Sequence, residues 1–147
     1  MASFLKIWGI ILAFSFLLCR LVVYNKDISW REFMKQHHLS PSKTFSSYKC
    51  DDLMREREAL RDKESHVFIY ASWHKIDRVC YSQNGKDRYG NVYVWVEQPF
   101  KILKCQKETS KNSYIETRSY NHIQFHCSMD GYVDRIEDIN VLEPLDK

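Results

Sequence analysis

The chain has 147 residues, which is the size of a single domain. Its composition, 44% apolar and 28% charged, excludes a disordered chain, because that share of apolar side chains can form a core. The formal net charge of +3 argues against a protein that binds nucleic acids or anionic membranes mainly through charge.

Residues 1–24 have the layout of a secretory signal peptide. Lys6 supplies a basic start, and the uncharged apolar run over residues 7–18 is shorter than the roughly 20 residues of a membrane-spanning helix. We predict cleavage between residues 19 and 25, which leaves residues 25–147 as the mature domain. A retained signal anchor is the alternative, because no clear small-residue cleavage site is visible.

Cleavage after residue 24 would remove Lys6 and Arg20 but no acid, so the mature chain would have 20 basic and 19 acidic residues and a net charge of +1. We therefore expect no strong nucleic-acid binding, and no stable membrane insertion after the signal is removed.

Two helices are expected early in the mature chain. Ser29 and Glu32 have the spacing of a capping box, and Pro41 is expected to end the helix that follows. The inward positions of this helix have the spacing i, i+3, i+4, i+7: Trp30, Phe33, Met34 and His37. A second helix is predicted from about Cys50 to Arg61, with acids in its first turn and arginines later, which complements the helix dipole.

Further along the chain the apolar pattern changes from helical to alternating. A short strand at residues 67–70 and a third helix at about residues 72–80 precede the change. Strands are then predicted at residues 93–96, 102–105, 122–127 and 139–142. Helices followed by antiparallel strands predict an α+β fold.

The mature chain has four cysteines, Cys50, Cys80, Cys105 and Cys127. In a secreted chain they indicate a disulfide framework, for which three pairings are possible. No cysteine or histidine spacing is typical of zinc, and we expect no metal and no cofactor. A metal site at His122 and His126 is disfavoured because Gln124 between them is a poor ligand and no carboxylate or cysteine completes the set.

Several motifs occur in chain order over nearly the whole mature chain: residues 33–37 (FMKQH), 48–54 (YKCDDLM), 63–68 (KESHVF), 77–80 (DRVC), 122–127 (HIQFHC) and 131–133 (GYV). Together they resemble the pancreatic-type ribonuclease (ribonuclease A) superfamily. Within it, the segments at residues 30–33 (WREF) and 131–134 (GYVD) resemble the epididymal secretory group.

The resemblance implies three helices, a curved antiparallel sheet and two disulfides. It pairs Cys50 with Cys105 and Cys80 with Cys127. Asp62 stands where typical members have a further cysteine.

The resemblance also implies the loss of catalysis. His37 matches the first catalytic histidine and Lys63 the catalytic lysine, but the second histidine is replaced by Ile136, which cannot transfer a proton. Val67 replaces the threonine that reads the base. We therefore expect no catalytic residue, with His37 and Lys63 as remnants, and expect the acids of residues 128–147 to repel a phosphate backbone.

His38, His122 and His126 are the available substitutes for the missing acid. We interpret His122 and His126 as ordinary surface histidines on the polar face of a strand. His37 is interpreted as a packed histidine bonded to the backbone, and Lys63 as a solvated lysine.

The resemblance therefore implies a secreted, non-catalytic binding protein of epididymal fluid, involved in sperm maturation, with an unknown protein partner, for example on the sperm surface. The candidate contact residues are aromatic, although we expect most of them to be core: Trp73, Tyr89, Tyr93 and Trp95. A weak pyrimidine-preferring ribonuclease and a host-defence protein are the alternatives, and the low net charge argues against the second.

Overall fold

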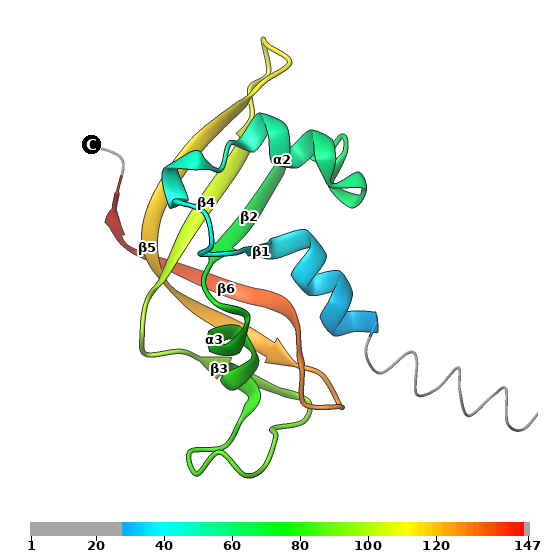
Figure 1. Cartoon of the computed structure of the whole chain (residues 1–147), viewed down its shortest axis with the longest axis vertical. Helices are drawn as coiled ribbons and strands as arrows, with labels where there is room; N and C mark the ends of the chain where they lie inside the picture. The colour runs from blue at the N-terminus through cyan, green and yellow to red at the C-terminus, as the bar shows by residue number, and fades with distance from the viewer. Residues whose placement is uncertain (1–27, 146–147) are drawn as a thin grey trace, which may run out of the picture.

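Residues 28–145 are described by the computed structural model, in which a curled sheet is packed against short helices (Figure 1). The predicted signal peptide lies outside the described residues. In residues 28–145 no helix is both long and apolar enough to cross a membrane. The first helix covers residues 28–37. The elements that follow are β1 (His38–Leu39), η1 (Phe45–Ser47), α2 (Cys50–Glu56), η2 (Glu58–Leu60), β2 (Ser65–Tyr70), α3 (Trp73–Asp77), η3 (Arg78–Cys80), β3 (Val92–Trp95), β4 (Phe100–Lys107), β5 (Tyr114–Cys127) and β6 (Val133–Pro144).

The sheet has the strand order β1-β2-β4-β5-β3, and β6 pairs with β5. All pairs are antiparallel except β1 with β2, so the sheet is mixed rather than purely antiparallel as expected. The long strand β5 pairs with β4 over residues 114–121, with β6 over residues 119–127 and with β3 over residues 124–127. The predicted α+β class is confirmed.

The sheet buries side chains on both faces, because neighbouring residues of β2 and β4 point in opposite directions. Ile69 and Ile102 belong to one core cluster, with Phe33 of the first helix and residues of α3 and β5. Phe68 and Leu103 belong to the other, with residues of α2. In Figure 1, α2 lies toward one end of the molecule and α3 and β3 toward the other, with the first helix between them.

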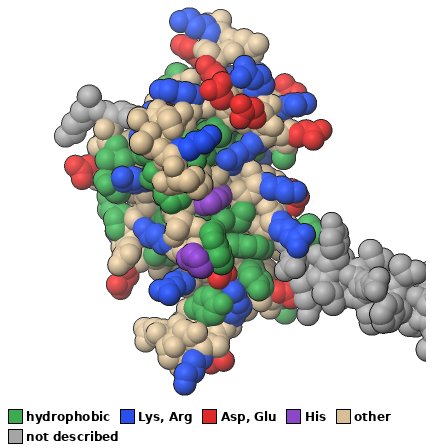
Figure 2. Space-filling view, viewed as in Figure 1, with side chains coloured by type: hydrophobic (Ala, Val, Ile, Leu, Met, Phe, Trp, Pro, Cys, Tyr) green, Lys and Arg blue, Asp and Glu red, His purple; other side chains and the backbone are tan. Residues whose placement is uncertain are grey.

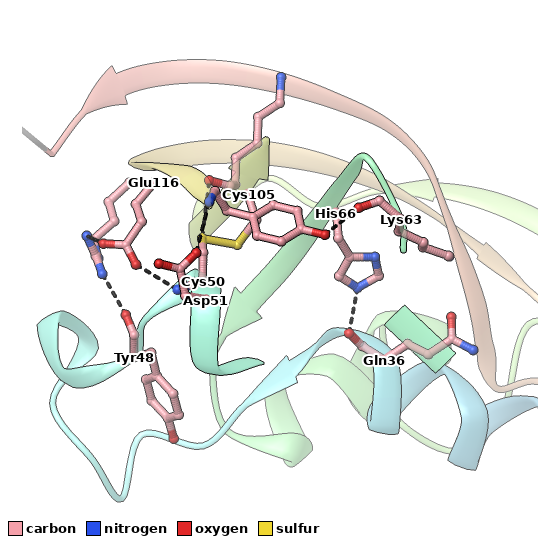
Figure 3. The surroundings of a disulfide bond; sticks show 11 residues. Gln36, Tyr48, Cys50, Asp51, Lys63, His66, Cys105 and Glu116 are labelled. Carbon is pink, nitrogen blue, oxygen red and sulfur yellow. Dashed lines mark hydrogen bonds and ion pairs between the residues drawn. A yellow bond between two sulfur atoms is a disulfide. The ribbon is translucent and has the colours of Figure 1, made fainter. Parts of the chain in front are cut away.

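Each core cluster contains one disulfide. Cys50–Cys105 ties α2 to β4, and Cys80–Cys127 ties the end of η3 to β5, which confirms both expected pairings. All four cysteines are fully buried. Figure 3 shows the first bridge, where the Glu116 carboxylate accepts a hydrogen bond from the backbone N–H of Cys50 at 2.6 Å and so caps the start of α2.

The first helix differs from its prediction at both ends. Residues 28 and 29 are already helical, so Ser29 is not the N-cap and the proposed capping box is wrong. The helix ends at His37, four residues before Pro41, because His38–Leu39 pairs with Ile69–Tyr70 as β1. Sheet pairing, not the proline, ends this helix.

The second helix is shorter than predicted, because Arg57 leaves the helical conformation with φ −85° and ψ 106°. Its guanidinium donates to the carbonyl oxygens of Lys35 at 3.0 Å and His38 at 2.8 Å. Residues 58–60 then form the 3₁₀ helix η2. The third helix is confirmed, with the Ser72 hydroxyl accepting from the N–H of Lys75 as its cap.

The turn before β6 requires a glycine. Gly131 has φ +81°, and a Cβ added there would lie 2.5 Å from the Cβ of Arg88. Arg88 cannot retreat easily, because its guanidinium pairs with Asp77 at 3.0 Å and stacks between the rings of Tyr81 and Tyr132. Because Gly131 has no side chain, the β5–β6 turn can pack closely against Arg88 in the loop before β3.

We expect Gly131→Ala to lower the free energy of unfolding by about 2–4 kcal/mol, from a left-handed backbone and an overpacked contact together. Gly85→Ala is the matched control, because Gly85 has φ +68° but a Cβ added there would meet nothing within 4 Å, so only about 1 kcal/mol is expected. Urea unfolding of both variants measures the difference. Equal losses would show that the Arg88 contact is unimportant.

Candidate functional site

A cleft of about 430 Å³ lies where the first helix, β2, β4 and β6 come together. The first helix contributes His37, β4 contributes Lys104, and β2 and β6 contribute residues 65–67 and 136–139. The structure thus brings His37 and Ile136 to the same cleft, although 99 positions of sequence separate them. This is the arrangement expected if Ile136 stands where a second proton-transfer group would be.

His37 has a fixed tautomer. Its Nδ1 lies 2.8 Å from the carbonyl oxygen of Val67, which can only accept, so Nδ1 carries the proton and Nε2 is the basic nitrogen. Burial lowers the pKa of His37, and the charges of Lys63 and Arg57 lower it further, against the effect of the bond to Val67. The expectation of a packed histidine bonded to the backbone is confirmed, and the same geometry leaves a neutral base in the cleft.

His66 is a site residue that the sequence reasoning missed. Its ring stacks on that of His37 with the centroids 4.5 Å apart and the planes 19° from parallel. Its Nε2 donates to the carbonyl oxygen of Gln36 at 2.6 Å, as Figure 3 shows. Burial lowers the pKa of His66 to about 4, and the neighbouring His37 adds to this effect. The signal was present in the motif at residues 63–68 (KESHVF), which places a histidine directly before Val67.

Two lysines supply positive charge to the cleft. Lys63 is exposed, lies just before β2, and is close enough to help lower the pKa of both His37 and His66. Figure 3 shows it beside His66. Lys104, which the sequence reasoning did not single out, lines the cleft and pairs with Val67 across β2 and β4. Lys104 therefore adds a second positive charge near His37, besides that of the expected remnant Lys63.

The opposite wall belongs to β6 and brings acids as well as Ile136. Glu137 and Asp138 line the cleft. Glu137 pairs with Arg135 at 3.2 Å, and Asp138 accepts a hydrogen bond from the backbone N–H of Ile139. Both carboxylates thus act as acceptors here, and they line the same cleft as Lys104.

None of the three substitute histidines considered from the sequence lines this cleft. His38 Nε2 donates to the carbonyl oxygen of Ala71 at 2.7 Å, and His122 Nδ1 lies 3.2 Å from that of Val96. His126 is buried, with its Nδ1 2.7 Å from an Asp134 oxygen, so its interpretation as a surface histidine is wrong. The polar face of β5 is covered there by side chains of β3 and β6.

Within residues 28–145 no three His, Cys, Asp or Glu side chains gather in a way that could hold a metal ion. His122 and His126 instead use their rings in the separate contacts just described.

The candidate contact aromatics are mostly on the surface. Trp73 is 51% exposed, Tyr93 51% and Trp95 46%, so the expectation that most of them are core is wrong. Tyr89 is half-buried against the core. Tyr93 and Trp95 lie on β3, an edge strand that pairs with β5, and their side chains are about half exposed.

Residues 28–139 match the family model described as pancreatic ribonuclease. Over 145 residues the chain is 63% identical to human epididymal secretory protein E3-beta and 55% identical to human epididymal secretory protein E3-alpha, and each alignment covers 99% of both chains.

Among solved structures, amphinase, a cytotoxic ribonuclease from Rana pipiens oocytes, is similar with a TM-score of 0.63 and 18% identity, over 78% of this chain and 99% of amphinase. Green turtle egg white ribonuclease is similar with a TM-score of 0.59 and 19% identity, over 75% and 97% of the two chains. At these identities the likeness concerns the fold alone.

Proposed function

This chain belongs to the pancreatic ribonuclease family, and we propose that it is a secreted member that has lost RNA cleavage and acts by binding a protein partner. One observation carries the proposal: Ile136 lies in the cleft with His37. RNA cleavage of the family type needs a base for the ribose 2′-OH and an acid for the leaving 5′-oxygen. His37 fits the first task, and an isoleucine cannot perform the second.

His66 does not replace the missing acid. With a pKa of about 4 it is neutral at physiological pH. Its one ring proton, on Nε2, is held by the carbonyl oxygen of Gln36, so the other nitrogen can only accept. Glu137 and Asp138 also line the cleft, and each acts as an acceptor in the contacts described above.

Secretion is supported by three features that agree. Residues 1–24 have the layout of a signal peptide. Two buried disulfides suit an oxidising compartment. The human relatives at 63% and 55% identity are named epididymal secretory proteins. We therefore propose secretion into epididymal fluid, and a role in sperm maturation is part of the proposal.

A protein partner fits the surface better than a nucleic acid does. Figure 2 shows basic side chains across the middle of the visible face and acidic ones mostly toward its top and edges, so this face carries charges of both signs. Exposed Tyr and Trp side chains are the types that dominate protein interfaces, and Tyr93 and Trp95 present two of them from one edge strand. Arg135 holds Tyr93 in place by donating to its hydroxyl at 2.9 Å.

An RNA cleavage assay tests the proposal. We expect turnover of cytidine- and uridine-containing RNA at least about 10²-fold below that of a catalytic family member, because one general acid contributes about 10²–10⁴. His37→Ala should leave this residual rate unchanged. A second experiment measures binding of the secreted chain to sperm, and we expect Tyr93→Ser to weaken that binding. Cleavage equal to that of a catalytic relative and abolished by His37→Ala would overturn the proposal.

A weak ribonuclease is the second candidate, because the tautomer of His37 and the nearby lysines are those a working cleft would use. It predicts slow cleavage that disappears in His37→Ala, and the assay above separates the two functions.

A further inference from the structure

Three histidines join the first helix and β1 to β2. His37 Nδ1 donates to the carbonyl oxygen of Val67 at 2.8 Å, and His38 Nε2 donates to that of Ala71 at 2.7 Å. The third bond runs in the opposite direction, because His66 Nε2, on β2, donates to the carbonyl oxygen of Gln36 in the first helix at 2.6 Å. We call these three side chains the histidine latch. Each of its three bonds joins residues that are 30 or 33 positions apart in the sequence.

We propose that the histidine latch is an acid-sensitive clasp, which holds the first helix and β1 on β2 at neutral pH and releases them when the medium becomes acidic. The proposal concerns a conformational response and goes beyond the proposed binding function.

Geometry supplies the reason. The rings of His37 and His66 are stacked 4.5 Å apart, so protonation of both would place two positive charges face to face. Aromatic rings flank the pair on both sides, with Phe33 against His37 and Phe68 against His66, both at 4.7 Å. These phenyl rings offer no hydrogen-bond acceptor and displace the water that would hydrate an imidazolium. Release of the helix would let water reach both rings.

The other charged groups around the pair are mostly cations. Lys63 lies before β2, Arg57 follows α2, and Lys104 comes from β4. Glu137 and Asp138 on β6 also line the cleft and oppose these charges in part. On the first helix itself, Lys35 and Glu32 pair with each other at 3.7 Å. Within residues 28–145, positive charge therefore predominates next to the stacked rings.

The direction of the pH effect follows from the pKa shifts. Burial lowers the pKa of all three histidines below the ordinary value of 6.5, that of His66 to about 4. The docked state thus binds fewer protons than the released state, so docking is complete above pH 6.5 and is weakened as the pH falls from 6.5 toward 4. In that window His66 can change the docking equilibrium by up to about tenfold per pH unit, and His37 and His38 act in the same direction.

Hydrogen exchange of the secreted chain, with both disulfides intact, tests the clasp. Between pH 7 and pH 5, after correction for intrinsic exchange rates, we expect residues 33–39 to lose at least about 20-fold in protection, because His66 alone supplies that factor by linkage and His37 and His38 act in the same direction. The amides of β4 and β5 should keep theirs. His66→Asn should remove most of the response, because an amide can donate to Gln36 but does not titrate, whereas His122→Asn, on β5 outside the latch, should respond like the wild type.

Unchanged protection of residues 33–39 at pH 5 would overturn the proposal, as would a response of His66→Asn equal to that of the wild type. Uniform loss over β4 and β5 as well would also overturn it, because that is global unfolding. If His66→Asn does not fold, the wild type alone tests the proposal, through the loss of amide protection in residues 33–39 compared with that in β4 and β5.

Discussion

Replacing Ile136 by histidine is expected to raise the rate of RNA cleavage by at least about 10²-fold over the wild type. The cleft already holds His37 with its basic nitrogen available, and Lys63 and Lys104 beside it. A histidine at position 136 would supply the proton that the leaving 5′-oxygen needs. Cleavage of a short uridine-containing RNA, measured against pH, checks the result. Val67→Thr, as a second step, should raise the rate further by restoring a hydroxyl for the base.

Two controls identify the source of any gain. Ile136→Asn introduces a polar side chain that does not titrate, and it should leave the rate at the wild-type level. His37→Ala combined with Ile136→His should abolish the gain, because the base is then missing. No gain from Ile136→His, in a variant that remains folded, would mean that Ile136 is not the decisive lesion and that other features, such as the acids on β6, also block cleavage.

Removing the Cys80–Cys127 bridge with Cys80→Ala and Cys127→Ala is expected to lower the free energy of unfolding by about 4 kcal/mol. The bridge closes 47 residues, and the entropy that it removes from the unfolded chain corresponds to about that value. Both cysteines are buried in the core cluster with Phe125 and Ile76, so two small cavities add to the loss. Urea unfolding monitored by circular dichroism measures the difference.

The wild type treated with a reductant is the natural comparison, because it breaks both bridges without changing the sequence. It should be less stable than the double variant, which keeps Cys50–Cys105. A loss below about 1 kcal/mol in the double variant would show that the core around Cys80 and Cys127, rather than the covalent bond, holds α3 against β5.

Much of the fold follows from local patterns. The strand at β2, the start of the third helix near Ser72 and the strand at residues 122–127 are short-range features, and each is confirmed. The pairing of the cysteines came from the family resemblance and is confirmed as well.

The errors arise where distant parts of the chain meet. The helical pattern continues past Glu56, but Arg57 bonds to carbonyl oxygens 19 and 22 positions earlier, and no local pattern reveals that. His126 alternates as a polar residue, yet Tyr93 and Asp134 cover it from two other strands. For the site, position 136 could be assigned by its spacing from Cys127, whereas the stacking of His66 on His37 depends on how the first helix lies on β2.

Strand β5 pairs with three other strands, and this affects when the sheet can form during synthesis. Synthesis delivers the amino end first, but β4, β6 and β3 all pair with β5, and its last residue is Cys127. β1, β2 and β4 can pair with one another earlier, but β3 and β6 can join the sheet only after synthesis has passed Cys127. The pairings of β2 with β4 and of β3 with β5 join segments that are distant in the sequence, which slows the search for the native state, and we expect refolding on the scale of milliseconds to seconds.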